Sequence, residues 1–155
     1  IKNLPDMIEN YSINNRKIIL RELLNSAYEK KQPVRIIDDT FNPYVYQELA
    51  DNVNRCMDNG SVLKAICLDS EIDFEDNGFI KAITKHKNGY FTQNTQTNLN
   101  LISPLCFMLV GGGSYCFKSS RVRQSKTITN FNDKKFGKCL EEEFDKVYEI
   151  IKSIS

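Results

Sequence analysis

Short apolar runs alternate along this chain with longer stretches in which apolar residues recur every three or four positions. The short runs predict strands, at Val34–Ile37, Val62–Leu68, Tyr90–Thr92, Leu105–Val110 and Ser125–Thr129. The longer stretches predict helices, over Ile19–Ala27, Val45–Met57, Gly78–Lys85 and Phe136–Ile154. Strands separated by helices favour right-handed crossovers and parallel pairing. The pattern therefore predicts an α/β fold with a mixed, mostly parallel sheet flanked by helices.

The length of the chain allows one domain of this kind. With 155 residues it has the size of a single ordinary domain. Residues 1–14 lack periodicity, so we expect a lead-in segment there and a single α/β domain over residues 15–155. Because the chain begins with Ile1 rather than Met, we expect a partner domain in a longer protein.

Turn and cap residues divide these elements. Asn42-Pro43 is typical of a helix start, and Asn59-Gly60 is typical of a helix end. Gly111–Gly113 lacks the lysine of a phosphate-binding loop and predicts a tight turn into a strand over Ser114–Lys118. Asn132 is the expected cap of the last helix. The glycines are thus interpreted as a hairpin turn.

Composition excludes several functional classes. Twenty-one basic and twenty acidic residues leave a net charge of +1, so no overall field favours nucleic acid or membrane. The longest apolar run, Leu105–Val110, is far too short to span a bilayer. Five cysteines without a CxxC pair favour a reducing, cytoplasmic setting over a disulfide framework. We expect no cofactor and no metal.

Acidic residues follow the first two predicted strands. Asp38 and Asp39 end the first strand, and Asp69 follows the second. Parallel strands place their carboxyl ends at one edge, where α/β proteins bind ligands. Paired carboxylates there offer oxygen ligands for Mg²⁺. The more conservative interpretation is that these aspartates cap helices and turns.

Two further features carry potential chemistry. Lys118, Arg121, Arg123 and Lys126 form a basic stretch without acids, which suits contacts to phosphate groups or nucleic acid. A solvated strand edge explains the same residues equally well. His86, the single histidine, lies between two lysines after a predicted helix, and we interpret it as an exposed helix-end residue rather than a catalytic base.

Several segments together carry a family resemblance. They are Ile19–Ala27 before Val34–Asp38, Tyr44–Asp58 before Val62–Leu68, Cys106–Phe117, Thr129–Asp133 and Leu140–Asp145. From about Arg16 to Ile151 this arrangement resembles the phospholipase D-like superfamily. The resemblance implies that Leu105–Val110 is the core strand, followed by a turn, another strand and a closing helix. It also implies a homodimer, because members of the superfamily pair two similar modules.

The catalytic signature of that superfamily is His-x-Lys, four residues and Asp, on the core strand. The best alignment places Pro104, Cys106 and Gly111 at these three positions. The resemblance therefore implies a degenerate member without catalytic residues. We expect a binding or scaffolding domain, with nucleic acid as a candidate partner within a larger bacterial protein. Two alternatives stay open: a Mg²⁺-dependent phosphohydrolase or nuclease using Asp38, Asp39 and Asp69, and a domain that senses a small-molecule effector.

Overall fold

The computed structural model describes residues 7–10, 13–71, 73–95, 105–118 and 127–154. Its helices are α1 (Ile13–Lys30), α2 (Pro43–Tyr46), the 3₁₀ helix η1 (Gln47–Leu49), α3 (Ala50–Asp58), α4 (Gly78–Lys85) and α5 (Lys134–Ile154). Its strands are β1 (Met7–Asn10), β2 (Val34–Asp38), β3 (Leu63–Cys67), β4 (Gly89–Gln93), β5 (Cys106–Val110), β6 (Ser114–Lys118) and β7 (Thr127–Asn130). No described helix is long and apolar enough to cross a membrane.

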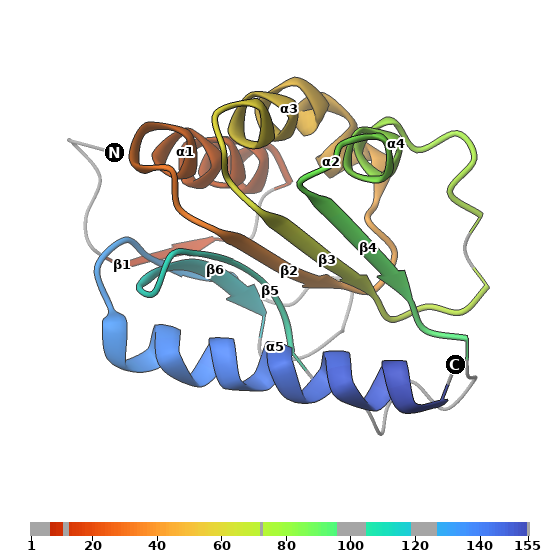
Figure 1. Cartoon of the computed structure of the whole chain (residues 1–155). Coiled ribbons are helices and arrows are strands. Elements are labelled where there is room, and N and C mark those ends of the chain that lie inside the picture. Colours follow the sequence, from red (N-terminus) through yellow and green to blue (C-terminus); the bar gives the residue numbers. More distant parts are fainter. Residues whose placement is uncertain (1–6, 11–12, 72, 96–104, 119–126, 155) are drawn as a thin grey trace.

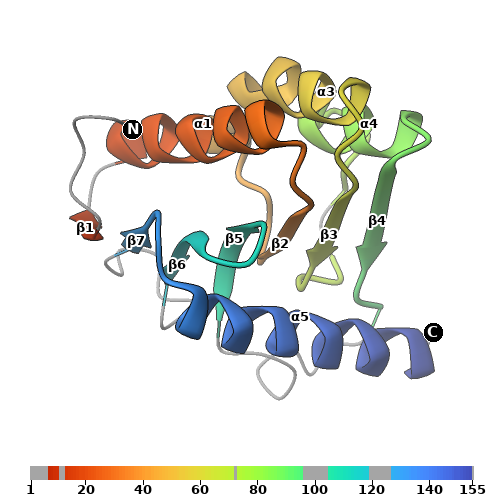
Figure 2. The same cartoon turned by 60° about the vertical axis from the view of Figure 1, so that its left-hand side comes forward.

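The described strands form one sheet in the order β1-β7-β6-β5-β2-β3-β4. Helices α1 to α4 cover one face of this sheet, and α5 alone runs across the other face (Figure 1). Figure 2 shows the same three layers from a second direction, with the sheet between the two sets of helices. The predicted α/β fold, with a mixed sheet flanked by helices, is confirmed.

Parallel pairing is less extensive than the sequence pattern predicts. Strands β2, β3 and β4 pair in parallel through crossovers that contain α3 and α4. All other described pairings, from β2 through β5, β6 and β7 to β1, are antiparallel. The expectation of mostly parallel pairing is therefore wrong. Helical crossovers join only β2, β3 and β4, whereas the short Gly111–Gly113 turn joins β5 to β6 and reverses the chain.

Two apolar clusters lie on the two faces of the sheet. On β2, Val34 and Ile36 face the cluster under α1 to α4, whereas Ile37 faces the cluster under α5. This alternation follows from the two-residue period of a strand. Leu140, Phe144, Val147 and Ile151 of α5 are buried against the second face, as the apolar stripe of this helix predicts.

The predicted helix caps and strand bounds are confirmed in part. Asn42 caps α2 through its side chain, and Asn59-Gly60 ends α3 with Gly60 at a φ of +101°. Two positions differ from expectation. Strand β1 pairs with β7 inside the expected lead-in segment, because long-range pairing supplies backbone partners that no local pattern reveals. The predicted strand over residues 125–129 is observed as Thr127–Asn130, and residues 125 and 126 lie outside the described residues.

The cap of α5 is Asp133 rather than the expected Asn132. One Asp133 carboxylate oxygen, Oδ1, accepts the backbone N–H of Phe136 at 3.1 Å, and the other accepts the Tyr115 hydroxyl at 2.7 Å. The hydrogen bond from Tyr115 lowers the pKa of Asp133 below its usual range. A carboxylate held by a strand residue thus orients the start of the helix.

The Gly111–Gly113 turn joins β5 to β6, as predicted, and also packs against α5. Gly111 has a φ of +60°, which favours glycine. A Cβ atom on Gly137 of α5 would lie 2.1 Å from the Gly112 carbonyl oxygen. The helix and the turn therefore approach so closely that backbone touches backbone.

This close approach makes a testable prediction for the Gly137→Ala variant. Alanine inside a helix ordinarily stabilises by about 1 kcal/mol relative to glycine. Here the clash with Gly112 must displace α5, so we expect a loss of about 1–3 kcal/mol in the free energy of unfolding. Urea unfolding followed by circular dichroism measures the difference.

Gly78→Ala is the matched control, because a Cβ atom on Gly78 of α4 would have no atom within 4 Å. We expect this control to be neutral or slightly stabilising. A stabilised Gly137→Ala variant would contradict the proposed close packing.

Candidate functional site

The carboxyl ends of β2 and β3 meet the start of β5 and the end of β6 at one edge of the sheet. Register places Asp38 opposite Cys67, and Cys106 opposite Lys118. Strands β2 and β5 pair through Ile37 and Phe107, one residue away from this edge. We call the edge formed by Asp38, Asp39, Cys67, Asp69, Cys106 and Lys118 the carboxyl rim.

Asp38 is the most buried carboxylate of the carboxyl rim, with 4% of its surface exposed. Its Oδ2 atom accepts the backbone N–H of Phe41 at 2.8 Å, and its Oδ1 atom lies 3.4 Å from Arg16 Nη2. Phe41 has a φ of +49°, an uncommon value for a bulky residue. The Asp38 carboxylate therefore supports a strained turn and an ion pair to α1.

Arg16 reaches the carboxyl rim from the first turn of α1. Its guanidinium also lies 5.8 Å from the centre of the buried Tyr46 ring. Burial alone would lower the pKa of Arg16, but the neighbouring Tyr46 and Asp38 outweigh this and raise it. The Arg16 Nε atom is buried and has no hydrogen-bond partner in the described part of the chain. Arg16 is thus charged, and only part of its hydrogen-bonding capacity is used.

Three buried cysteines surround this ion pair. Burial raises the pKa of Cys106 and of Cys116, so both remain neutral thiols at physiological pH. Burial also raises the pKa of Cys67 to about 12, and its thiol donates to the Asp39 carbonyl at 3.0 Å. A buried neutral thiol is a poor nucleophile and a poor metal ligand. These cysteines act as small packing residues.

The other two predicted acids lie next to each other at the carboxyl rim. The Asp69 backbone N–H donates to the Asp39 carbonyl at 3.0 Å. The Asp69 side chain accepts the Glu71 backbone N–H at 2.9 Å, which is a turn-forming contact. No group of three or more His, Cys, Asp or Glu side chains in the described ranges is arranged to hold a metal ion.

The predicted basic stretch is described only at its first residue. Lys118 ends β6 at the carboxyl rim and is half-buried. Arg121, Arg123 and Lys126 lie outside the described residues. Their role therefore stays a prediction.

His86 lies away from the carboxyl rim. It precedes β4 at the opposite end of the sheet, where Gly89 pairs with Leu63 at the start of β3. Its Nδ1 atom accepts the Asn88 backbone N–H at 3.0 Å, so Nε2 carries the proton that points to Asp58 Oδ1 at 2.8 Å. With 16% of its side chain exposed, His86 is less exposed than expected. One ring nitrogen bonds to the turn before β4, and the other bonds to the last residue of α3.

Sequence reasoning did not identify Arg16 as part of this edge. A signal for it exists, because Arg16 stands four and seven residues before Leu20 and Leu23, both buried. A base on the apolar face of a helix requires a buried partner. The partner, Asp38, is far away in sequence and could not be identified from spacing.

The Arg16–Asp38 pair makes a prediction about energetic coupling. We expect Asp38→Asn and Arg16→Met each to lower the free energy of unfolding by about 3 kcal/mol, because each leaves a charge buried without its partner. The double variant should lose less than the sum, with a coupling of about 1–3 kcal/mol.

The control is the pair of Lys17 and Glu48, which lie 3.6 Å apart and whose carboxylate side chain is 60% exposed, against 6% for Asp38. A double-mutant cycle of Lys17→Met, on α1 like Arg16, and Glu48→Gln, on η1, should give a coupling of at most about 1 kcal/mol. Additive losses at Arg16 and Asp38 in urea unfolding would show that the buried pair is not an interacting unit.

Comparisons with known proteins concern the fold. No protein-family model and no curated protein sequence matches the chain. Among solved structures, the archaeal chromatin protein TrmBL2, described as showing a novel mode of DNA binding, is similar with a TM-score of 0.69 and 13% identity. The match covers 96% of this chain and 54% of TrmBL2, so the chain spans about half the length of that protein.

Two further structures match nearly end to end. NucT from Helicobacter pylori has a TM-score of 0.67 and 10% identity, over 92% of this chain and 95% of its own. Nuc from Salmonella typhimurium, a phospholipase D family member, has a TM-score of 0.64 and 14% identity, over 94% of this chain and 95% of its own. This chain therefore has a phospholipase D-like fold.

Proposed function

We propose that this chain is a nucleic-acid-binding domain with a phospholipase D-like fold and no phosphodiesterase chemistry. The observation that carries the second part is Cys106. The family resemblance aligns this residue with the catalytic lysine, and in this chain it is a buried thiol with 2% of its surface exposed. A neutral thiol cannot hold a phosphate by charge.

The surroundings of Cys106 support the same conclusion. Two cations act on Cys106: Lys118, which is paired with it across the sheet, and Arg16 of α1, which pairs with Asp38 rather than being free for a substrate. His86, the one histidine of the chain, lies at the other end of the sheet. Phosphodiester cleavage through a covalent intermediate needs a nucleophile within reach of the phosphorus atom. The described carboxyl rim offers a buried thiol with a raised pKa instead.

Binding to nucleic acid rests on charge and on one similar protein. TrmBL2 is described as a DNA-binding chromatin protein, and its structure matches nearly the whole of this chain. Lys118 leads from the carboxyl rim into the stretch that contains Arg121, Arg123 and Lys126. Arginine forks bind phosphate oxygens in pairs. Tyr44, 79% exposed after β2, offers a ring on which a base can stack.

A homodimer belongs to the same proposal. NucT and Nuc are chains of similar extent to this one, which supports a single module that pairs with a second copy. The additional length of TrmBL2 supports the alternative arrangement, in which a partner domain extends the chain. Five free cysteines, four of them buried, support a reducing, cytoplasmic setting.

The Mg²⁺-dependent enzyme is less well supported. Asp38 already accepts from Phe41 and pairs with Arg16, and Asp69 stabilises a turn. Removing these contacts to bind a metal would leave buried groups without partners, which costs free energy. For the effector-sensing alternative, the groove beside Asp38 and Asp69 is the expected site; a cavity lined by Val110 and Ser114 lies at the opposite end of the sheet.

The absence of phosphodiesterase chemistry is tested with bis(p-nitrophenyl) phosphate. We expect no release of p-nitrophenol above a buffer blank, with or without millimolar Mg²⁺. The matched control is Cys106→Ala, which should behave identically because the thiol has no catalytic role in the proposal. Turnover by the natural chain that Cys106→Ala abolishes would contradict it.

Nucleic-acid binding is tested by fluorescence anisotropy with a short DNA duplex. We expect affinity to fall with salt, and Arg121→Glu with Arg123→Glu to reduce the slope of log K against log salt by about 2. Lys81→Glu with Lys85→Glu, on exposed positions of α4, makes the same change in net charge and should keep that slope. Light scattering on the same samples should give the mass of a dimer. Equal binding by both variants would contradict the proposal.

A further inference from the structure

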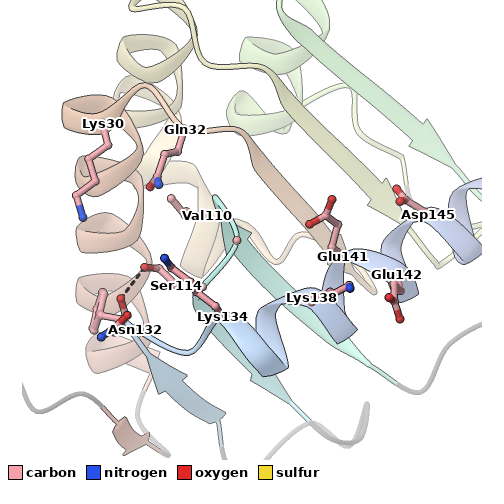
Figure 3. A pocket seen from close by; sticks show the side chains of 13 residues that line it. Lys30, Gln32, Val110, Ser114, Asn132, Lys134, Lys138, Glu141, Glu142 and Asp145 are labelled. Carbon is pink, nitrogen blue, oxygen red and sulfur yellow. Dashed lines mark hydrogen bonds between the residues drawn. The ribbon is translucent and has the colours of Figure 1, made fainter.

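A cavity of about 470 Å³ lies at the end of the sheet opposite the carboxyl rim. Val110 at the end of β5 and Ser114 at the start of β6 line it, whereas the carboxyl rim contains the other ends of the same two strands. Helix α5 and the segment after α1 close its sides (Figure 3). Its volume is within the range of pockets that bind small ligands and short peptide segments.

The side chains of α5 that line the cavity are charged, and bases precede acids along the helix. Five residues of α5 face the cavity: Lys134, Lys138, Glu141, Glu142 and Asp145. Their spacing of three or four residues places them along one side of the helix. Bases occupy the first part of this stripe and acids the later part. Lys30 at the end of α1 joins the basic part (Figure 3).

The basic part of this stripe is unfavourable for the helix itself. Acids stabilise the amino end of a helix and bases its carboxyl end, because of the helix dipole. Helix α5 has no acid in its first turn and begins with Lys134 and Lys135. The two lysines of the first turn therefore oppose the helix dipole, which the Asp133 cap offsets in part, whereas the acids over 141–145 lie mid-helix, where the dipole has little effect. An acidic group of a ligand beside Lys134 would relieve this unfavourable charge.

Most of the charged side chains that line the cavity also have no ion-pair partner in the described part of the chain. In the described part of the chain, Lys30, Lys134 and Lys138 have no carboxylate oxygen within 4 Å, and neither Glu142 nor Asp145 has a basic nitrogen within that distance. Glu141 is the exception, with Arg35 Nη2 at 3.5 Å. Both ends of the stripe are thus available to outside charges.

The part of the cavity wall formed by the glycine turn is tightly packed. Gly111 packs against the Gln32 amide, where a Cβ atom would lie 2.7 Å from Nε2, and Gly113 packs against Lys134. The Ser114 hydroxyl donates to the Phe131 carbonyl at 2.9 Å. A larger side chain at either glycine would fill this region. The glycine turn therefore preserves the cavity as well as the hairpin.

We infer that this cavity binds a short peptide segment of a partner protein that carries an acidic group at one end and a basic group at the other. The acidic group would lie at Lys30 and Lys134, and the basic group at Glu142 and Asp145. Lys134 and Asp145 stand eleven positions apart on α5, a distance along the helix of about 16 Å, which about five extended residues span. A nucleic-acid backbone would meet three carboxylates along this wall, so it fits poorly. The inference does not depend on the proposed nucleic-acid binding.

The experiment titrates the 155-residue chain with blocked, fluorescently labelled hexapeptides and measures anisotropy. One peptide has two glutamates, two glycines and two lysines in that order, and the second has the same residues with alternating charges. We expect the first to bind at least about fivefold more tightly, because only it satisfies both ends of the stripe. Equal affinity for the two peptides would overturn the inference.

Variants of adjacent lysines separate binding from stability. Lys134→Glu should weaken binding of the first peptide at least about fivefold. Lys135→Glu makes the same charge change one residue away, is exposed and does not line the cavity, so it should bind as the natural chain does. Both variants should raise the midpoint of thermal unfolding, because an acid then stands in the first turn of α5. Equal loss of binding in both would overturn the inference.

The acidic end has its own test and its own control. Glu142→Gln with Asp145→Asn should weaken binding of the first peptide, and Glu149→Gln, exposed farther along α5, should not. Displacement of the bound peptide by duplex DNA would overturn the inference by assigning the cavity to a nucleic-acid surface. Loss of duplex binding in the Arg121 and Arg123 variant, with peptide binding unchanged, would separate this inference from the proposed function.

Discussion

The ion pair between Arg16 and Asp38 organises the carboxyl rim of this fold. A carboxylate that is 4% exposed is stable in its charged form only with donors around it. Asp38 receives them from α1 through Arg16 and from its own turn through Phe41, while its backbone carbonyl accepts from Leu68 after β3. One residue of β2 therefore connects the first helix, the turn that follows β2 and the end of the neighbouring strand β3.

The same pair explains what the carboxyl rim is chemically suited to do. A paired guanidinium and three neutral thiols lie at this centre, and none of them is a nucleophile activated by a neighbouring base. The fold is similar to those of TrmBL2, NucT and Nuc, and Cys106 is buried within it. Under the proposed function, binding would depend on the surface around Lys118 and Tyr44 rather than on this buried centre.

The opposite end of the sheet depends on a different constraint, the contact between Gly137 and the Gly112 carbonyl. Because backbone meets backbone there, α5 lies close enough to cover the second face with Leu140, Phe144 and Val147. Asp133 fixes the start of the helix through Tyr115, which belongs to β6. This anchoring sets the position of the charged stripe on α5 above the cavity. Under the two proposals, the two ends of the sheet would bind separate partners.

Much of the architecture could be predicted from local patterns. The short, fully apolar run of β5, the glycine turn after it and the helical period of α5 are each typical of the structure observed there. Strand β1 and the extent of antiparallel pairing could not be predicted in this way. Partners of an isolated four-residue strand are chosen by distant backbone groups, and the four residues themselves carry little preference.

For the candidate sites the division is similar. The sequence alone determined that acids follow β2 and β3 and that a basic stretch follows β6, because these facts need only residue identity and order. Only the tertiary structure decided that Asp38 is paired with Arg16, that His86 lies at the other end of the sheet and that the lysines of α1 and α5 share a cavity. Burial and charge pairing arise between segments distant in sequence, so no local pattern contains them.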